Sequence, residues 1–274
     1  MPKKKKSNGC PMGYGTDAPA VYGESDLSYN DYLKVPQITN LQFPQSKPAH
    51  HDELLFIIIH QAYELWFKLI IHELENAIHH IVKKEVLQAQ HFVHRIVEIL
   101  KLLVSQIHIL ETMRPIDFLR FREKLMPASG FQSLQFREIE FLLGLKDEKY
   151  LKFFEKRPDV VKALNSRLKG NDLHGAYFGM LKSLGFKIDG AARFKSLCEI
   201  YQNPQDNLPL YLLSESLLEL DEHLALWREH HVRVVERIIG GKRGTGGSSG
   251  VNYLRSTSQK KCFPELWEIR SHLN

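Results

Sequence analysis

The sequence contains little cysteine. Its 274 residues include only Cys10, Cys198 and Cys262, which lie far apart along the chain. Disulfide scaffolds, structural zinc modules and iron–sulfur clusters all require clustered thiols. These classes are therefore excluded, and a reducing, cytoplasmic compartment is the natural expectation.

Glycine is absent from a long part of the chain. None occurs between Gly23 and Gly130, and residues 49–114 lack proline as well, so nothing in that stretch interrupts a helix. By contrast, six glycines gather between Gly240 and Gly250. This distribution predicts long uninterrupted helices and one loop rich in glycine.

Long apolar runs are also missing. The run Leu54–Ile59 is soon followed by His60, Glu64 and Lys68, whereas a membrane-spanning helix needs roughly 18 predominantly apolar residues. The lysines at 3–6 precede no apolar segment of the kind found in secretory signals. We therefore expect no association with a membrane.

The excess charge is small. Lys+Arg number 37 and Asp+Glu 32, and Lys3–Lys6 contribute four of the positive charges, so the rest of the chain is nearly neutral. This balance lacks the electrostatic footprint of a nucleic-acid-binding protein. We expect residues 1–25 to form a basic, disordered tail ahead of a single helical domain at residues 26–274.

Apolar residues recur at helical spacing in several segments. The pattern predicts three long helices, from about His51 to Lys84, from Leu87 to Met113 and from Leu210 to Ile239. A short helix is expected from Pro115, and another at Phe131–Leu143. No convincing alternating strand is present, so the predicted fold is all-α, a bundle of long helices.

The segment Gly240–Gly250 follows the third long helix directly. Gly240 is expected to end that helix in the left-handed αL conformation. Successive glycines can turn backbone N–H groups inward to form an anion nest, although the segment lacks the Gly-Lys-Ser/Thr pattern of a nucleotide-binding P-loop. We favour an ordered loop that contacts a carboxylate, phosphate or propionate, the alternative being a flexible linker.

The 14 histidines raise the question of metal chemistry. A di-iron carboxylate bundle requires Glu-x-x-His pairs, and no Asp or Glu stands three residues before a histidine. Haem requires only one axial histidine and an apolar pocket. His60 and His231 each interrupt an apolar helical stripe and are the candidates, although most such histidines are hydrogen-bonded core residues.

Arg122 is a further candidate, because arginine presents a bidentate fork to a carboxylate. It follows the aromatic residues Phe118 and Phe121. The alternative is a surface arginine paired with Glu123. Local sequence leaves both readings open.

Four segments closely resemble the tryptophan 2,3-dioxygenase family and occur in that family's order and spacing. They are Pro48–Trp66, Asp117–Glu123, Pro127–Arg137 and Lys242–Val251. The resemblance covers about Leu27 to Ile269 and is weak between residues 145 and 210. It implies a haem b enzyme, with one haem per subunit, that inserts both atoms of O₂ across the indole C2–C3 bond of L-tryptophan. The product would be N-formyl-L-kynurenine, formed in the first step of tryptophan catabolism by the kynurenine pathway.

The resemblance also implies roles for residues near the haem. His231 is similar in position to the proximal iron ligand, and the register from Trp227 to Thr245 selects it over His230. Gly246 would contact the cofactor. His60 resembles the distal histidine that accepts a hydrogen bond from the indole N–H, and Phe56 would pack on the indole.

Other residues are implied in binding the amino-acid end of the substrate. Arg122 would clamp the carboxylate, and Thr245 would hold the ammonium and carboxylate end. Phe118 stands where some members of the family have tyrosine. Tyr29 and Tyr32 match a segment that reaches the site of a neighbouring subunit, so a homotetramer is implied.

Two other functions remain possible from the sequence. The chain could be a related haem enzyme that oxidises another indole derivative, but a complete amino-acid clamp favours tryptophan. It could instead be a haem-binding sensor or carrier without turnover, against which the same clamp argues. A helical nucleic-acid-binding protein is disfavoured by the nearly neutral body of the chain.

Overall fold

The computed structural model describes residues 26–273 and divides after Leu41 into two units, which are considered separately. The first contains helices α1 (Tyr29–Leu33) and α2 (Val35–Ile38), and the Ser28 hydroxyl caps α1 by accepting the Asp31 N–H at 3.1 Å. The expected tail at residues 1–25 lies outside the described residues. A single domain over 26–274 stays a prediction.

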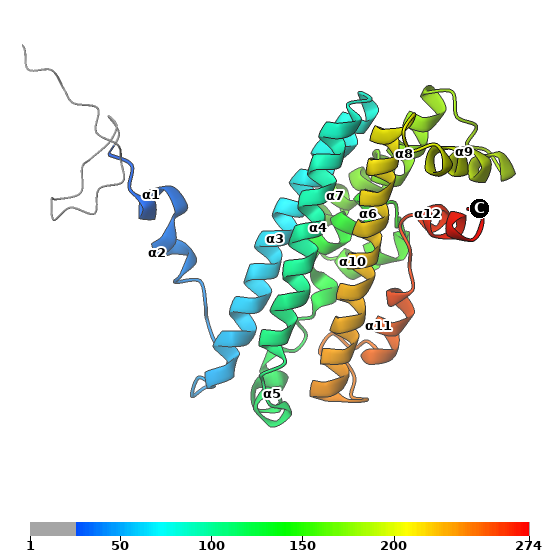
Figure 1. Cartoon of the computed structure of the whole chain (residues 1–274). Helices are drawn as coiled ribbons and strands as arrows, with labels where there is room; N and C mark the ends of the chain where they lie inside the picture. Colours follow the sequence, from blue (N-terminus) through cyan, green and yellow to red (C-terminus); the bar gives the residue numbers. More distant parts are fainter. Residues whose placement is uncertain (1–25, 274) are drawn as a thin grey trace, which may run out of the picture. The chain divides into compact units, whose positions relative to one another are not determined.

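Three long helices dominate the second unit (Figure 1). They are α3 (His51–Val82), α4 (Val86–Leu110) and α10 (Leu208–Ile239), within a few residues of the predicted bounds. No strand occurs among the described residues 26–273, which confirms the all-α fold. The absence of glycine and proline from residues 49–114 leaves only a short break between α3 and α4.

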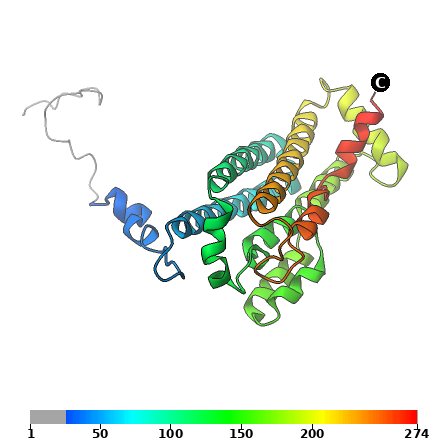
Figure 2. The same ribbon diagram turned by 90° about the horizontal axis from the view of Figure 1, so that it is seen from below.

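The core lies where α4 packs against both α3 and α10. Seen from below, α4 is next to each of these helices (Figure 2). Leu74 of α3, Leu103 of α4 and Leu220 of α10 are completely buried. Their burial removes apolar surface from water, the main force that holds such a bundle together.

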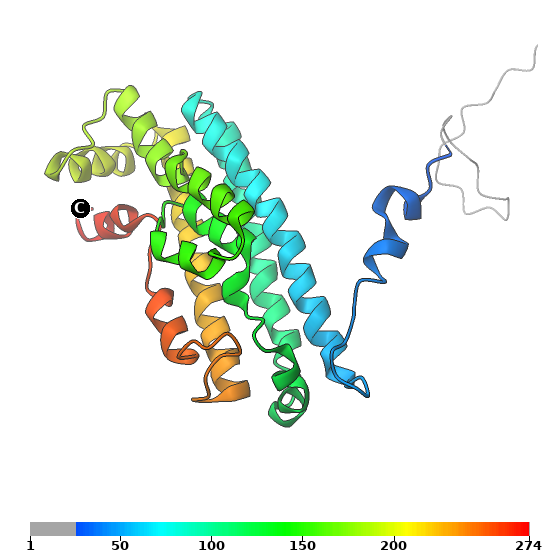
Figure 3. The same ribbon diagram turned by 180° about the vertical axis from the view of Figure 1, so that it is seen from behind.

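Shorter helices cover this layer. α6 and α8 pack on α3, as the view from behind shows, and α11 packs on α10 (Figure 3). The α-helices in this group are α5 (Pro115–Arg122), α6 (Leu134–Leu142), α7 (Pro158–Lys169), α8 (Leu173–Ser183), α9 (Ala191–Gln202), α11 (Val251–Ser258) and α12 (Pro264–Glu268). The 3₁₀ helices are η1 (Glu123–Leu125), η2 (Gly130–Gln132), η3 (Glu148–Phe154) and η4 (Ile269–Ser271).

The predicted helix at Phe131–Leu143 is interrupted near its start. Ser133 adopts φ −67° and ψ 106°, and its hydroxyl accepts the N–H of Phe136 at 3.2 Å. Serine stabilises a helix N-terminus in this way, so α6 begins only at Leu134. The preceding residues form the separate 3₁₀ turn η2.

The prediction that Gly240 ends α10 in the αL conformation is wrong. Gly240 has a positive φ of 56°, but its ψ of −135° lies outside the αL region. This combination is open essentially to glycine alone because other residues have a Cβ. The Gly240 N–H still bonds the Glu236 carbonyl at 2.9 Å, and the chain then turns sharply into the loop.

Helix α3 is more apolar than the short run Leu54–Ile59 suggested. Its mean hydropathy reaches 1.6 over 18 residues, enough by length and composition alone for a membrane span. The same composition is found in core helices of soluble proteins. α3 packs along α4, α6 and α8, and it buries Ile70, Leu74 and Ile81.

Candidate active site

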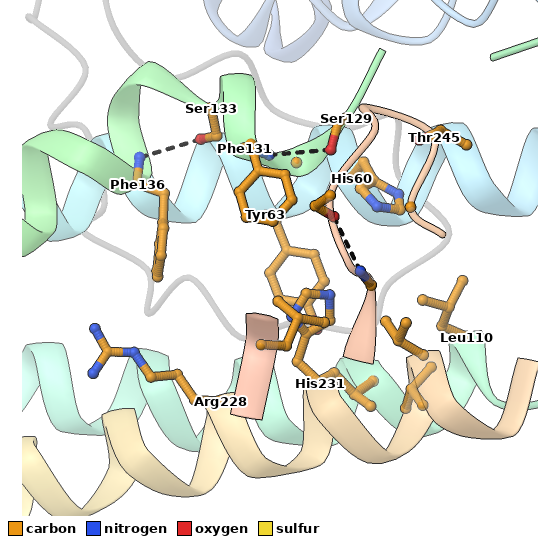
Figure 4. Close-up of a pocket in the computed structure, with 18 of the residues that line it drawn as sticks. His60, Tyr63, Leu110, Ser129, Phe131, Ser133, Phe136, Arg228, His231 and Thr245 are labelled. Carbon is orange, nitrogen blue, oxygen red and sulfur yellow. Dashed lines mark hydrogen bonds between the residues drawn. The ribbon is translucent and has the colours of Figure 1, made fainter. Parts of the chain in front are cut away.

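A cavity of about 270 Å³ lies between α3 and α10 (Figure 4). Side chains from α4, α5, α6 and α11 complete its walls together with Gly240–Gly250, which we call the glycine-rich loop. His60 of α3 and His231 of α10 line it from two sides. The cavity therefore brings together the two histidines singled out in the sequence.

His60 is held in one tautomer. Its Nδ1 lies 2.7 Å from the Phe56 carbonyl oxygen, which can only accept, so Nδ1 carries a proton. Burial among the cavity walls lowers the pKa of His60 below the ordinary value of 6.5, although the Phe56 carbonyl and Glu64 partly oppose this shift. The ring is therefore neutral at pH 7, and its Nε2 is a hydrogen-bond acceptor.

His231 is also neutral. Burial lowers its pKa to about 4, and the proximity of His60 adds to the effect. Its ring stacks on Trp227, with 5.5 Å between centroids and an interplanar angle of 17°. A neutral imidazole fixed against an aromatic ring is well suited to ligate a metal.

His230 does not share this environment. Its Nδ1 lies 2.9 Å from the Leu226 carbonyl, and its ring makes an edge contact with His108 at 5.7 Å. Unlike His231, it is not part of the cavity lining. Adjacent residues on a helix point about 100° apart, which explains the difference.

Aromatic rings form the wall beside His60. The Phe56 ring lies 4.1 Å from the His60 ring and 5.5 Å from that of Phe118, centroid to centroid. Phe118 is buried and, like Phe56, lines the cavity. This wall offers an apolar, aromatic surface against which an aromatic ligand can pack.

Arg122 and Thr245 both line the cavity, but each is already hydrogen-bonded to a backbone carbonyl. The Arg122 guanidinium donates to the carbonyl of Arg243, in the glycine-rich loop. The Thr245 hydroxyl donates to the carbonyl of Ala128 at 2.6 Å. Arg122 is therefore a cavity residue and not a surface partner of Glu123.

Three of the predicted site residues are not among those that line the cavity. Gly246 is not among the cavity residues; it approaches Ser129, which does line the cavity. Tyr29 and Tyr32 belong to α1 in the first unit and expose 75% and 71% of their surface.

The cavity wall also contains a buried charge cluster that the sequence analysis did not identify. Glu140 of α6 accepts hydrogen bonds from Arg137 at 2.5 Å and from Arg228 of α10 at 2.9 Å. These three side chains, which we call the Arg-Glu-Arg cluster, are at most 5% exposed. A usable signal was available, because Arg228 lies four residues after Leu224 and three before His231, on the buried face of the helix.

Two buried N–H groups of the wall lack acceptors. They are the Nε of Arg137 and the Nε1 of Trp227, neither of which has an acceptor with hydrogen-bond geometry. The Trp227 N–H still faces the Tyr63 hydroxyl and lowers the pKa of Tyr63, against the larger raising effect of burial. The Arg-Glu-Arg cluster holds two guanidiniums and one carboxylate, so its own formal charge is positive. Buried donors of this kind call for an anionic acceptor.

These features together fit a haem. An apolar cavity and a neutral histidine suit the iron porphyrin, while the unpaired N–H groups and excess positive charge suit its two carboxylate side chains. In the described residues no cluster of three or more His, Cys, Asp or Glu could hold a bare metal ion. A single axial histidine is the donor set of a haem protein.

The fold and the cavity thus define an all-helical, cofactor-binding protein with two neutral histidines facing one apolar site. Comparison of the sequence with known families is more specific. The model of the tryptophan 2,3-dioxygenase family matches residues 15–176 and 186–273. The chain belongs to the tryptophan 2,3-dioxygenase family.

Individual relatives agree over nearly their whole length. Tryptophan 2,3-dioxygenase of Nocardioides sp. is 46% identical over 260 residues, covering 92% of this chain and 97% of the relative. That of Caulobacter vibrioides is 41% identical, covering 90% and 99%. That of Xanthomonas euvesicatoria is 38% identical, covering 99% and 94%.

The Arg-Glu-Arg cluster yields a test of stability. Glu140→Gln should lower the free energy of unfolding by about 3 kcal/mol, because it leaves two buried guanidiniums without a countercharge. Glu98→Gln is the control, since the side chains of Glu98 and Lys101 are 55% and 41% exposed and such solvent-screened pairs contribute little to stability. Urea unfolding measures both, and equal effects would show that the buried cluster is not needed for stability.

Proposed function

We propose that this protein is a haem-dependent dioxygenase that converts L-tryptophan and O₂ to N-formyl-L-kynurenine, the first step of the kynurenine pathway. The observation that carries the proposal is a single cavity lined by neutral His60 and His231 together with Arg122 and Thr245. Membership of the family supports the same activity.

A haem b would be held in this cavity by His231, whose imidazole would ligate the iron. Trp227 would keep the imidazole ring in place by stacking, and the Arg-Glu-Arg cluster would meet the carboxylate side chains of the haem. Gly246 lies behind Ser129, so it would act on the cofactor only through that residue. When bound, the haem supplies the chemistry that activates O₂.

His60 would position the indole. Its unprotonated Nε2 can accept the indole N–H, and the nearby Phe56 ring can pack on the indole face. Because His60 is neutral, it makes this contact without placing a charge in the apolar part of the cavity. Phe118 adds apolar surface on the same side.

The other end of the substrate would meet Arg122 and Thr245. The guanidinium would exchange the Arg243 carbonyl for the substrate carboxylate, and the Thr245 hydroxyl would take part in holding the ammonium and carboxylate groups. An ionic acceptor forms a stronger hydrogen bond than a neutral carbonyl, so the exchange is favourable.

The chain then has to orient reactants more than it has to transfer protons. Both oxygen atoms of O₂ enter the product and the indole C2–C3 bond is cleaved, so no further reductant is required. Fixing the indole and the amino-acid end separately removes most rotational freedom of the substrate, which is a large source of rate acceleration.

We further propose a cytoplasmic homotetramer. Leu54, Ile58 and Leu65 expose 47%, 46% and 57% of their surface along α3, an apolar stripe typical of an interface. Tyr29 and Tyr32 on α1 would reach a neighbouring site. Cys198 and Cys262 are free thiols, as expected in a reducing compartment.

Light scattering of the purified protein should give the mass of four chains, and a monomer would contradict the assembly.

The activity itself is tested with ferrous, haem-loaded protein, L-tryptophan and O₂. We expect N-formylkynurenine, and kcat/KM at least about 100-fold lower for tryptamine, which lacks the carboxylate and leaves Arg122 without an anionic partner. Arg122→Gln should reduce this discrimination. Absence of product from fully ferrous protein would overturn the proposed function.

The assignment of the axial ligand is tested by comparing adjacent histidines. His231→Ala should abolish stoichiometric haem binding or change the absorption spectrum of the bound haem. His230→Ala should leave both unchanged, because that ring lies against His108 outside the cavity. Haem titration followed by absorption spectroscopy measures haem binding in the two variants. Loss of haem from His230→Ala and not from His231→Ala would assign the ligand to His230.

The role of His60 predicts a pH dependence. The pKa of His60 lies below 6.5, so Nε2 stays an acceptor at neutral pH and is protonated only in more acid solution. We expect kcat/KM to be constant down to about pH 6.5 and to fall below it.

The matched variant His60→Ala should bind haem normally, turn over more slowly and lack this acid limb. An acid limb that persists in His60→Ala would belong to another group. Loss of haem from this variant would instead make His60 a structural residue or a ligand.

A further inference from the structure

The six glycines of the glycine-rich loop serve different purposes. Gly240, Gly247 and Gly250 have positive φ angles of 56°, 83° and 64°, which side chains rarely tolerate. Gly246 has no such angle, so its backbone conformation is open to any residue. Glycine at 246 therefore requires another explanation.

That explanation is a close approach to Ser129. A Cβ at position 246 would lie 2.5 Å from the Ser129 Cβ and 2.9 Å from its hydroxyl oxygen, closer than non-bonded atoms come. The next neighbour, the Pro127 carbonyl oxygen, would be at an ordinary 3.8 Å. Ser129 is thus the only obstacle among these nearest atoms, and its Cβ cannot rotate away.

The contact occurs between two segments that meet at the cavity. Next to Gly246, the Thr245 hydroxyl donates to the Ala128 carbonyl, the residue before Ser129. Three residues before Gly246, the Arg243 carbonyl accepts a hydrogen bond from the Arg122 guanidinium. The glycine-rich loop is therefore fastened to residues 128–129 and to α5 at the point where Thr245 and Ser129 enter the cavity lining.

We propose that Gly246 is a positioning residue: its lack of a side chain lets the glycine-rich loop sit directly on Ser129, which places Thr245 for the amino-acid end of the substrate. This inference rests on the proposed function. It gives Gly246 a role through Ser129 and Thr245, with no contact of its own to the ligand.

Adding one methyl group tests the close approach. Gly246→Ala must move the loop backbone, because the atom that it meets is the Cβ of Ser129. A misplacement of about 1 Å can lower a rate or an affinity by about 100-fold when it displaces a positioning group. We expect KM and the dissociation constant for L-tryptophan to rise at least about tenfold, with haem content and the substrate-free absorption spectrum unchanged.

The chain offers a matched control. Gly241→Ala adds the same methyl group to the same loop, where no heavy atom lies within 4 Å and φ is not positive. This variant should bind L-tryptophan as the unmodified protein does. An equal loss in Gly241→Ala would overturn the proposal, since loop flexibility and not the Ser129 contact would then be the cause.

Two double variants identify the atom responsible. Ser129→Gly removes both the Cβ and the hydroxyl, so Ser129→Gly/Gly246→Ala should bind L-tryptophan within about threefold of Ser129→Gly alone. Ser129→Ala keeps the Cβ, and Ser129→Ala/Gly246→Ala should remain impaired relative to Ser129→Ala. The proposal would be overturned if Ser129→Gly/Gly246→Ala did not recover L-tryptophan binding, or if Ser129→Ala/Gly246→Ala recovered it equally well.

A readout without substrate separates this proposal from the function. Lys242 and Arg243 are exposed, and trypsin should cleave after them faster in Gly246→Ala than in the unmodified holoprotein or Gly241→Ala, with protection restored in Ser129→Gly/Gly246→Ala. Absence of turnover in the unmodified protein would overturn the proposed function and leave this result standing. Normal turnover with unchanged cleavage and KM in Gly246→Ala would overturn only the positioning role.

Discussion

The packing of aromatic side chains between α3, α6 and α10 determines where the cavity can form. Phe67 and Phe136 contact Trp227 with ring centroids 6.2 and 5.2 Å apart, and Trp227 in turn stacks on His231. α4 packs against both long helices and holds them on one side, while these large rings separate them on the other. Space for a ligand and the orientation of His231 therefore come from the same set of contacts.

Two opposite electrostatic conditions are met within this one space. The histidines are kept uncharged by removal from water, whereas the Arg-Glu-Arg cluster retains a net positive charge in the same wall. Arginine can remain charged where histidine cannot, because its intrinsic pKa is far higher. The site thus combines a region suited to neutral imidazole chemistry and a region suited to anions in one cavity wall.

The long helices could be predicted from the sequence because they depend on local spacing. His60 and His231 could be named as candidates because each interrupts an apolar stripe, but spacing alone did not show that they line one cavity. The break at Ser133 depends on one capping hydroxyl, which a periodic apolar pattern does not register. The hydrogen bond between Glu140 and Arg228 connects residues 88 positions apart in the sequence. Each of the two resembles an ordinary surface charge within its own segment. The close approach of Gly246 to Ser129 was likewise beyond reach, since a glycine cluster shows that side chains are absent but not which neighbour excludes them.

The hydrogen bonds of Arg122 and Thr245 to carbonyl groups affect how strongly a ligand can be held. One N–H of Arg122 and the hydroxyl of Thr245 already have carbonyl acceptors, so a ligand that takes these two donors replaces one acceptor with another and gains only the difference between the old and new bonds. That difference is on the order of 1 kcal/mol for each bond when a charged acceptor replaces a neutral one. Specificity can then be high while residence remains short, since departure of the product restores bonds that the protein already possesses.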